Sequence, residues 1–246
     1  MIKTIKTMSK QEKERYTVPR KVQDVIPVRR IWPDGIFLVG NKFSKTYKFS
    51  DINYLVASRE DKESMFLTYS ELLNSLDSGA VTKITINNRR MNQANFETSI
   101  LMPMQGDFRD EYRGEYNQML LDKATGANGI MQEKYITISV VKKDIEEARA
   151  YFSRVGADLI SHFAALGSKC VELDATERLR ILHDFYRQGE ESEFVFNARE
   201  MMKRGHSFKD YICPDGIEKK SDYLKLGGKF CRVLFLKDFA SYIKDN

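Results

Sequence analysis

The sequence predicts an α+β protein in which helices pack on a mixed β-sheet. Two kinds of apolar spacing alternate along the chain, and turn residues separate them. One kind repeats every three or four residues, which is typical of a helix with one buried face, and the other repeats every second residue, which is typical of a half-buried strand. Because strands and helices alternate, we expect at least part of the sheet to be parallel or mixed.

The first predicted elements form a β-hairpin. Residues 36–39 and 43–49 have the composition of strands, and Gly40-Asn41 lies between them. A glycine next to an asparagine favours the tight turn that joins two antiparallel strands. We therefore expect these two segments to pair.

A helix followed by a strand is expected next. Ser58 or Asp61 can cap the helix, and Gly79 can end it because glycine readily adopts the left-handed conformation of a helix end. The stripe that faces the core is expected to contain Met65, Tyr69, Leu72, Leu73 and Leu76. Residues 82–87 then alternate between apolar and polar side chains, which predicts a strand.

The clearest helix is predicted over residues 144–166. Asp144 can cap it, and its apolar positions follow at steps of three and four: Ile145, Ala148, Phe152, Val155, Leu159, Phe163 and Leu166. A strand is expected before it at 135–141. A short strand at 170–173 and a helix capped by Asp174 are expected after it.

The last part of the chain gives weaker patterns. We expect a helix near 197–203, a strand at 231–235 and a helix that begins at Asp238 and is unfinished at the end of the sequence. This last helix suggests that the chain is a fragment of a longer protein.

One irregular segment is a candidate surface for contact with a partner. Residues 91–106 lack periodicity and precede a helix expected at 109–123, whose face carries Tyr112, Tyr116, Met119 and Leu120. Methionine-rich apolar loops can serve as adaptable contact surfaces. The candidate contact residues are Ile100, Leu101, Met102 and Met104. Burial against the neighbouring helix is the alternative interpretation.

Charge divides the chain into parts. The net charge is +5, yet residues 1–30 contain nine Lys or Arg and three Asp or Glu, so the rest is nearly neutral. We expect a flexible basic arm at 1–34, an α+β core domain at 35–189 and a C-terminal extension at 190–246. The arm could contact nucleic acid or an anionic membrane through Lys3, Lys6, Lys10, Lys13, Arg15, Arg20 and Lys21. A merely solubilising tail is the alternative.

No catalytic residue, cofactor site or metal site is expected in this chain. A nucleotide-binding P-loop needs a first glycine and a hydroxyl residue after the lysine, whereas Gly227-Gly228-Lys229 is followed by Phe230. This segment is therefore interpreted as a turn. The chain also lacks closely spaced pairs of His and Cys, so a zinc site and a disulfide framework are not expected, and its three cysteines are expected to be reduced.

Apolar content of 42% suffices for a packed core, and charged residues interrupt every long apolar run. We expect a cytoplasmic protein, at most peripheral to the inner face of the plasma membrane.

Several segments resemble one family over nearly the whole chain from about Pro33 onward. The segments are REDKESMF, YSELLNSLDSGAVTKITINNRR, EYNQMLLDKATGANGI, EEARAYFSRVGADL and CPDGIE. Together they resemble the N-terminal region of TraE/TrbE/CagE-like (VirB-type) conjugal transfer ATPases of type IV secretion, in the branch found in mobile elements of Gram-positive bacteria. None of these segments is a catalytic motif, so the resemblance rests on their number and order.

The resemblance implies a docking and oligomerisation module. It would place the motor at proteins of the inner-membrane secretion channel, and self-association of the full-length protein is expected. ATP and Mg²⁺ would bind only in a motor domain that this chain does not contain. Two alternatives stay open: a DNA-binding module that acts through the basic arm, and an enzyme of unrecognised type.

Overall fold

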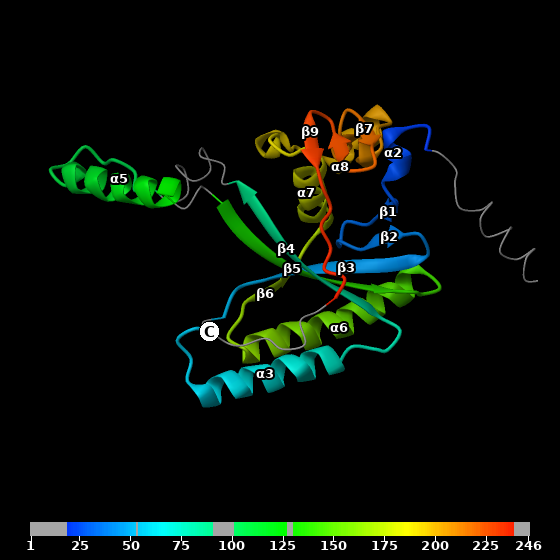
Figure 1. Ribbon diagram of the computed structural model, residues 1–246, viewed down its shortest axis with the longest axis horizontal. Helices are drawn as coiled ribbons and strands as arrows, with labels where there is room; N and C mark the ends of the chain where they lie inside the picture. Colours follow the sequence, from blue (N-terminus) through cyan, green and yellow to red (C-terminus); the bar gives the residue numbers. More distant parts are fainter. Residues whose placement is uncertain (1–18, 53, 91–100, 127–129, 239–246) are drawn as a thin grey trace, which may run out of the picture.

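The structure is a computed structural model that describes residues 19–52, 54–90, 101–126 and 130–238. Its described part contains both helices and two antiparallel sheets, which confirms the predicted α+β class. Figure 1 shows the larger sheet between two groups of helices.

The larger sheet is built around one central strand, β3 (Lys42–Phe49). One edge of β3 pairs with β5 (Ile130–Val140), and β5 pairs with β4 (Val81–Arg90). The other edge pairs near its start with β2 (Phe37–Val39) and near its end with β6 (Cys170–Glu172). The outermost strand, β1 (Val28–Ile31), pairs with β2.

Every strand pair in the described ranges is antiparallel, so the expectation of parallel pairing is wrong there. The reason is the position of β5. Strands β3 and β4 run in the same direction and are joined by helix α3 (Arg59–Asn74), but β5 lies between them. The order β3-α3-β4-β5-α6-β6 is the split βαβ arrangement of ferredoxin-like folds.

One face of this sheet carries the main core. Helices α3 and α6 (Ile145–Ala165) cover it, and both begin as predicted, with Ser58 and Asp144 as their caps. The buried side chains include Phe43, Tyr47, Leu72, Ile136, Ile138, Phe152, Val155, Leu159 and Phe163. Leu73 is an exception to the predicted stripe, because its side chain is exposed. It directly follows Leu72, and two consecutive helical residues point in different directions.

A second layer covers part of the opposite face. It consists of elements from both ends of the described chain, which lie above the sheet in Figure 1. They are α2 (Val22–Val25), α7 (Ala175–Tyr186), η1 (Glu191–Glu193), α8 (Ala198–Arg204), η2 (Phe208–Tyr211) and the small sheet of β7 (Ile217–Lys219), β8 (Leu224–Leu226) and β9 (Lys229–Cys231).

This second layer joins segments from all three parts of the expected division. Ile26, Val28 and Phe37 pack with Leu179 and Ile212 in one buried cluster. Residues from 22 onward therefore belong to the folded body, although a flexible arm was expected as far as residue 34. The expected extension from residue 190 likewise packs against the core domain, because the cluster needs side chains from both.

The strand expected at 231–235 is also wrong. Strand β9 ends at Cys231, and the next described residues form no strand. The side chains of Val233, Leu234, Phe235 and Leu236 are exposed. The helix expected from Asp238 lies outside the described residues, apart from Asp238 itself. Helix α8, in contrast, confirms the helix predicted near 197–203, and Asn197 caps it.

Candidate partner-contact surface

Strands β4 and β5 extend beyond the body of the protein and carry a helix at their far end. They pair over ten positions, from Val81 with Ser139 to Arg90 with Ile130. Helix α5 (Asp110–Gly126) lies between them in sequence. Figure 1 places α5 beyond the ends of both strands and away from α3 and α6.

The predicted contact loop lies against α5. The backbone N–H of Met102 donates to Oδ1 of Asn117 over 2.8 Å, and Nδ2 of Asn117 donates to the carbonyl of Met102 over 2.9 Å. The Asn117 side chain is buried, although most of its neighbours on α5 are exposed. These two bonds fix the loop to the middle of the helix.

A charged network fixes the start of α5. Asp110 accepts hydrogen bonds from the backbone N–H groups of Gln105 (3.0 Å) and Gly106 (2.7 Å). The guanidinium of Arg113 donates to Asp110 over 2.6 Å and also to Asp107. The pKa of Asp107 is lowered mainly by Arg113, and the pKa of Asp110 is lowered mainly by the N–H of Gln105. Both carboxylates are therefore ionised at neutral pH.

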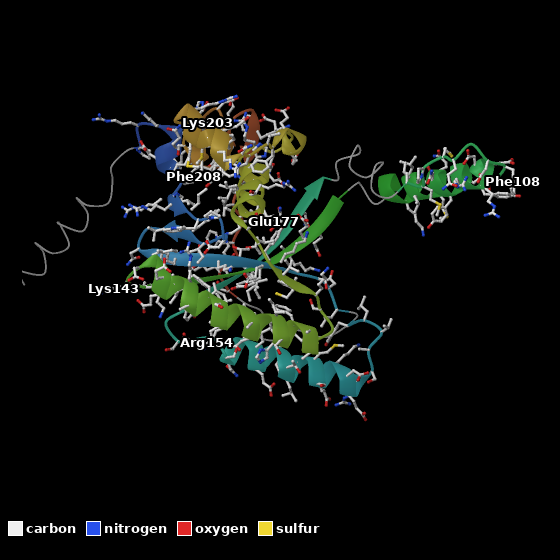
Figure 2. The ribbon with its side chains drawn as sticks, turned by 180° about the vertical axis from the view of Figure 1, so that it is seen from behind. Phe108, Lys143, Arg154, Glu177, Lys203 and Phe208 are labelled. Carbon is white, nitrogen blue, oxygen red and sulfur yellow. The ribbon has the colours of Figure 1, made fainter. Side chains whose placement is uncertain are left out.

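The outward face of this unit is apolar. Phe108, Tyr112, Tyr116 and Met119 are all exposed, and Phe108 and Tyr112 reach 82% and 68%. Figure 2 shows Phe108 at the outer end of α5. Tyr112, Tyr116 and Met119 are four and then three residues apart, so they share one side of the helix. We call Phe108, Tyr112, Tyr116 and Met119 the α5 surface.

The structure brings part of the predicted contact loop to this surface. Met102 and Met104 are exposed, whereas Leu101 is half-buried. Ile100 lies outside the described residues. The aromatic residues of α5 were not among the candidate contact residues, although their spacing was visible in the sequence. The sequence pattern that could have identified these aromatic residues is an apolar helix face directly after an apolar loop.

The predicted basic contact residues are placed only in part. Arg20 and Lys21 are described and exposed, next to the start of α2. Lys3, Lys6, Lys10, Lys13 and Arg15 lie outside the described residues. Arg29 and Arg30, on strand β1, add two further exposed cations.

The described residues contain no cluster of His, Cys, Asp and Glu that could hold a metal ion. The segment Gly227-Gly228 is the turn between β8 and β9, where Gly227 has a φ of +55°, so the interpretation of this segment as a turn is confirmed. No helix within the described ranges combines the length and apolar content needed to cross a membrane.

The surface features available for binding a partner are thus the exposed apolar face of α5 and a group of exposed cations near the start of α2. No protein-family model matches this chain, and no curated protein shows significant similarity to it.

Proposed function

We propose that this chain is a docking and self-association module of a conjugative-transfer ATPase, and that the α5 surface is its contact surface. The observation that carries the proposal is an exposed aromatic face on a helix that lies beyond the ends of β4 and β5. Large exposed apolar patches commonly mark sites of protein association. The link to conjugative transfer, and to proteins of the inner-membrane secretion channel, rests on the sequence resemblance.

The occupant of the α5 surface is a second copy of this chain. Helix α5 carries Glu111 in its first turn and Lys123 in its last, and both side chains are exposed. In an antiparallel pair of α5 helices centred between Tyr116 and Met119, Glu111 of one copy lies near Lys123 of the other. The apolar faces then cover each other, and opposite charges meet at both ends.

Sedimentation velocity of the full chain tests this proposal. Tyr116→Glu places a charge in the centre of the apolar face, and we expect it to convert a dimer to a monomer. Met202→Glu is the matched control, because Met202 is also an exposed apolar residue on a helix but lies on α8. Equal dimerisation of both variants would contradict the proposal, as would a monomeric wild-type chain at the highest accessible concentration.

Charge exchange tests the antiparallel arrangement. Glu111→Lys alone and Lys123→Glu alone each place like charges opposite each other, so each is expected to weaken the dimer. The double variant restores opposite charges and is expected to recover most of the affinity. Additive weakening in the double variant would exclude this pairing.

Binding of nucleic acid is the second candidate function. The exposed Arg20, Lys21, Arg29 and Arg30 favour it, because cations near one another bind phosphates with a steep dependence on salt. Duplex DNA affinity is measured over a series of salt concentrations, with the full chain and with a variant in which Arg20, Lys21, Arg29 and Arg30 are changed to Gln. Affinity that falls steeply with salt and disappears in this variant would support this function. Affinity that is unchanged in the variant would exclude a role for these four cations.

A further inference from the structure

The face of the large sheet opposite the main core is polar where β3, β5 and β4 meet. Thr46 pairs with Thr137, and Thr137 pairs with Lys83, so these three side chains form one row across three strands. The hydroxyls of Thr46 and Thr137 lie 2.8 Å apart and share a hydrogen bond. The next row contains Tyr135 and Thr85. This face of the sheet therefore presents hydroxyl groups and the ammonium group of Lys83 to the space on that side of the sheet.

A pocket of about 380 Å³ lies over this polar floor. Its wall is apolar, and α7 contributes much of it through Ile181, Leu182, Phe185 and Tyr186. Further lining residues come from the segment around β1 and β2, including Phe37. The volume lies within the range of pockets that bind small organic molecules.

Arg178 of α7 also lines the pocket, and the residue is buried, with only 9% of its surface exposed. Nη1 donates to the carbonyls of Gly35 and Ser44, each over 2.7 Å, and Nη2 donates to Oγ of Ser44 over 3.1 Å. Phe37 lies against the guanidinium, with its ring centroid 4.0 Å away. These contacts use three of the five N–H groups of the guanidinium.

The charge of Arg178 is not compensated by a carboxylate in the described part of the chain, where all its hydrogen-bond acceptors are neutral oxygens. Burial lowers the pKa of Arg178 to about 9, which still leaves the guanidinium charged at neutral pH. A buried charge without a counter-ion is unfavourable, and an anion next to it relieves that cost. The pocket is the space from which an anion can reach this group.

We propose that the pocket between α7 and the polar face of the sheet binds a small organic carboxylate with an apolar body. The carboxylate accepts from the N–H groups of Arg178 that remain free of protein acceptors and from the one hydroxyl of the Thr46–Thr137 pair that does not donate within the pair. Lys83 at the rim adds a second positive charge. The apolar body contacts Leu182 and Tyr186.

A monoanion fits this site better than a phosphate dianion. Transferring a dianion from water into a partly apolar pocket is far more costly than transferring a single charge. The planar fork of a guanidinium also matches a carboxylate well. The apolar wall further favours a ligand with a hydrocarbon part over a free inorganic anion.

The probe pair for the test is benzoate and benzamide, which have nearly the same shape and differ in charge. Binding to the full chain is followed by NMR through the backbone amides of Thr46 and Thr137 and the Nε–H of Arg178. Benzoate is expected to shift these signals saturably, with an affinity at least about tenfold higher than that of benzamide. Equal affinities, or the absence of saturable shifts with benzoate, would overturn the proposal.

The variant for this test is Lys83→Gln, because Arg178 also supports the turn at Gly35 and its replacement endangers folding. Lys48→Gln is the matched control: Lys48 lies on the same sheet face but does not line the pocket. Lys83→Gln is expected to lower benzoate affinity several-fold, whereas Lys48→Gln leaves it unchanged. Equal effects of the two variants would show only a general influence of net charge and would overturn the site.

Discussion

Gly35 is the position where substitution is expected to cost the most for the smallest chemical change. Its φ is +76°, and a Cβ built there would lie 2.0 Å from the backbone carbonyl oxygen of Leu173. The carbonyl of Gly35 also accepts from Arg178. The change Gly35→Ala therefore disturbs the approach of the segment before α7 to the sheet and displaces an acceptor of a buried guanidinium.

Gly40 provides the matched control. Its φ is +61°, but a Cβ built there meets nothing within 4 Å. Both alanine variants carry the cost of a left-handed backbone, about 1–2 kcal/mol. Only Gly35→Ala adds a collision with backbone atoms, for which overpacking costs of about 1–3 kcal/mol are typical. We expect about 2–5 kcal/mol for Gly35→Ala and about 1–2 kcal/mol for Gly40→Ala.

Thermal unfolding followed by circular dichroism measures the difference. For a chain of this length, 1 kcal/mol corresponds to about 2–4 °C in Tm. The extra collision cost of about 1–3 kcal/mol therefore places the Tm of Gly35→Ala roughly 2–12 °C below that of Gly40→Ala. If the two Tm values agree, the close approach of Leu173 to Gly35 does not limit stability, and the reasoning is refuted.

Three further predictions concern side chains. Lys45 is buried, with its Nζ 2.5 Å from a carboxylate oxygen of Glu172, whose side chain is 40% exposed. Glu172→Gln leaves the buried ammonium without its counter-ion and is expected to lower the free energy of unfolding by about 2–3 kcal/mol. Urea unfolding is expected to show a smaller loss for Lys45→Met, which removes the buried charge. The reverse order would contradict this account. Burial raises the pKa of Cys170 to about 11, so its thiol stays protonated at about pH 8. Iodoacetamide is therefore expected to modify the less buried Cys231 before Cys170. Mass spectrometry of peptides measures the order of modification. Preferential modification of Cys170 would be inconsistent with its burial. In Asp110→Ala the backbone amides of Gln105 and Gly106 lose their acceptor, so they are expected to exchange hydrogen faster while Tm changes little. In the wild type, the stabilisation of the loop by the Asp110 carboxylate is fully present above the usual carboxyl pKa of about 4. It is lost as the pH falls through the lower pKa that Asp110 has in the folded protein. Unchanged exchange rates would show that Asp110 does not hold the loop.

Local patterns in the sequence predicted the elements that depend on local spacing. The stripe of α6 and the cap at Asp144 depend only on residues within the helix, and both were correct. The strand order could not be predicted, because the position of β5 between β3 and β4 is set by contacts between residues far apart in sequence. Strand β1 was missed because its four residues include Arg29 and Arg30, whose charges suggested an arm.

The same limit applies to the functional surfaces. The spacing of Tyr112, Tyr116 and Met119 is identical for a helix that faces a core and for one that faces solvent, so the sequence cannot show that they are exposed. Arg178 lies among charged neighbours on α7 and has the sequence context of a surface residue. Only the packing of α7 on the sheet buries it, and that packing depends on residues from both ends of the described chain.

The insertion between β4 and β5 has a consequence for how fast the protein folds. In a simple hairpin these strands would meet after a turn of two residues, whereas here residues 91–129 separate them. Closing the longer loop costs about 0.6 kcal/mol for each doubling of its length, or about 2.5 kcal/mol in all. Formation of the β4–β5 pair is therefore expected to be a slow step in refolding, and replacing the insertion with a tight turn should accelerate it.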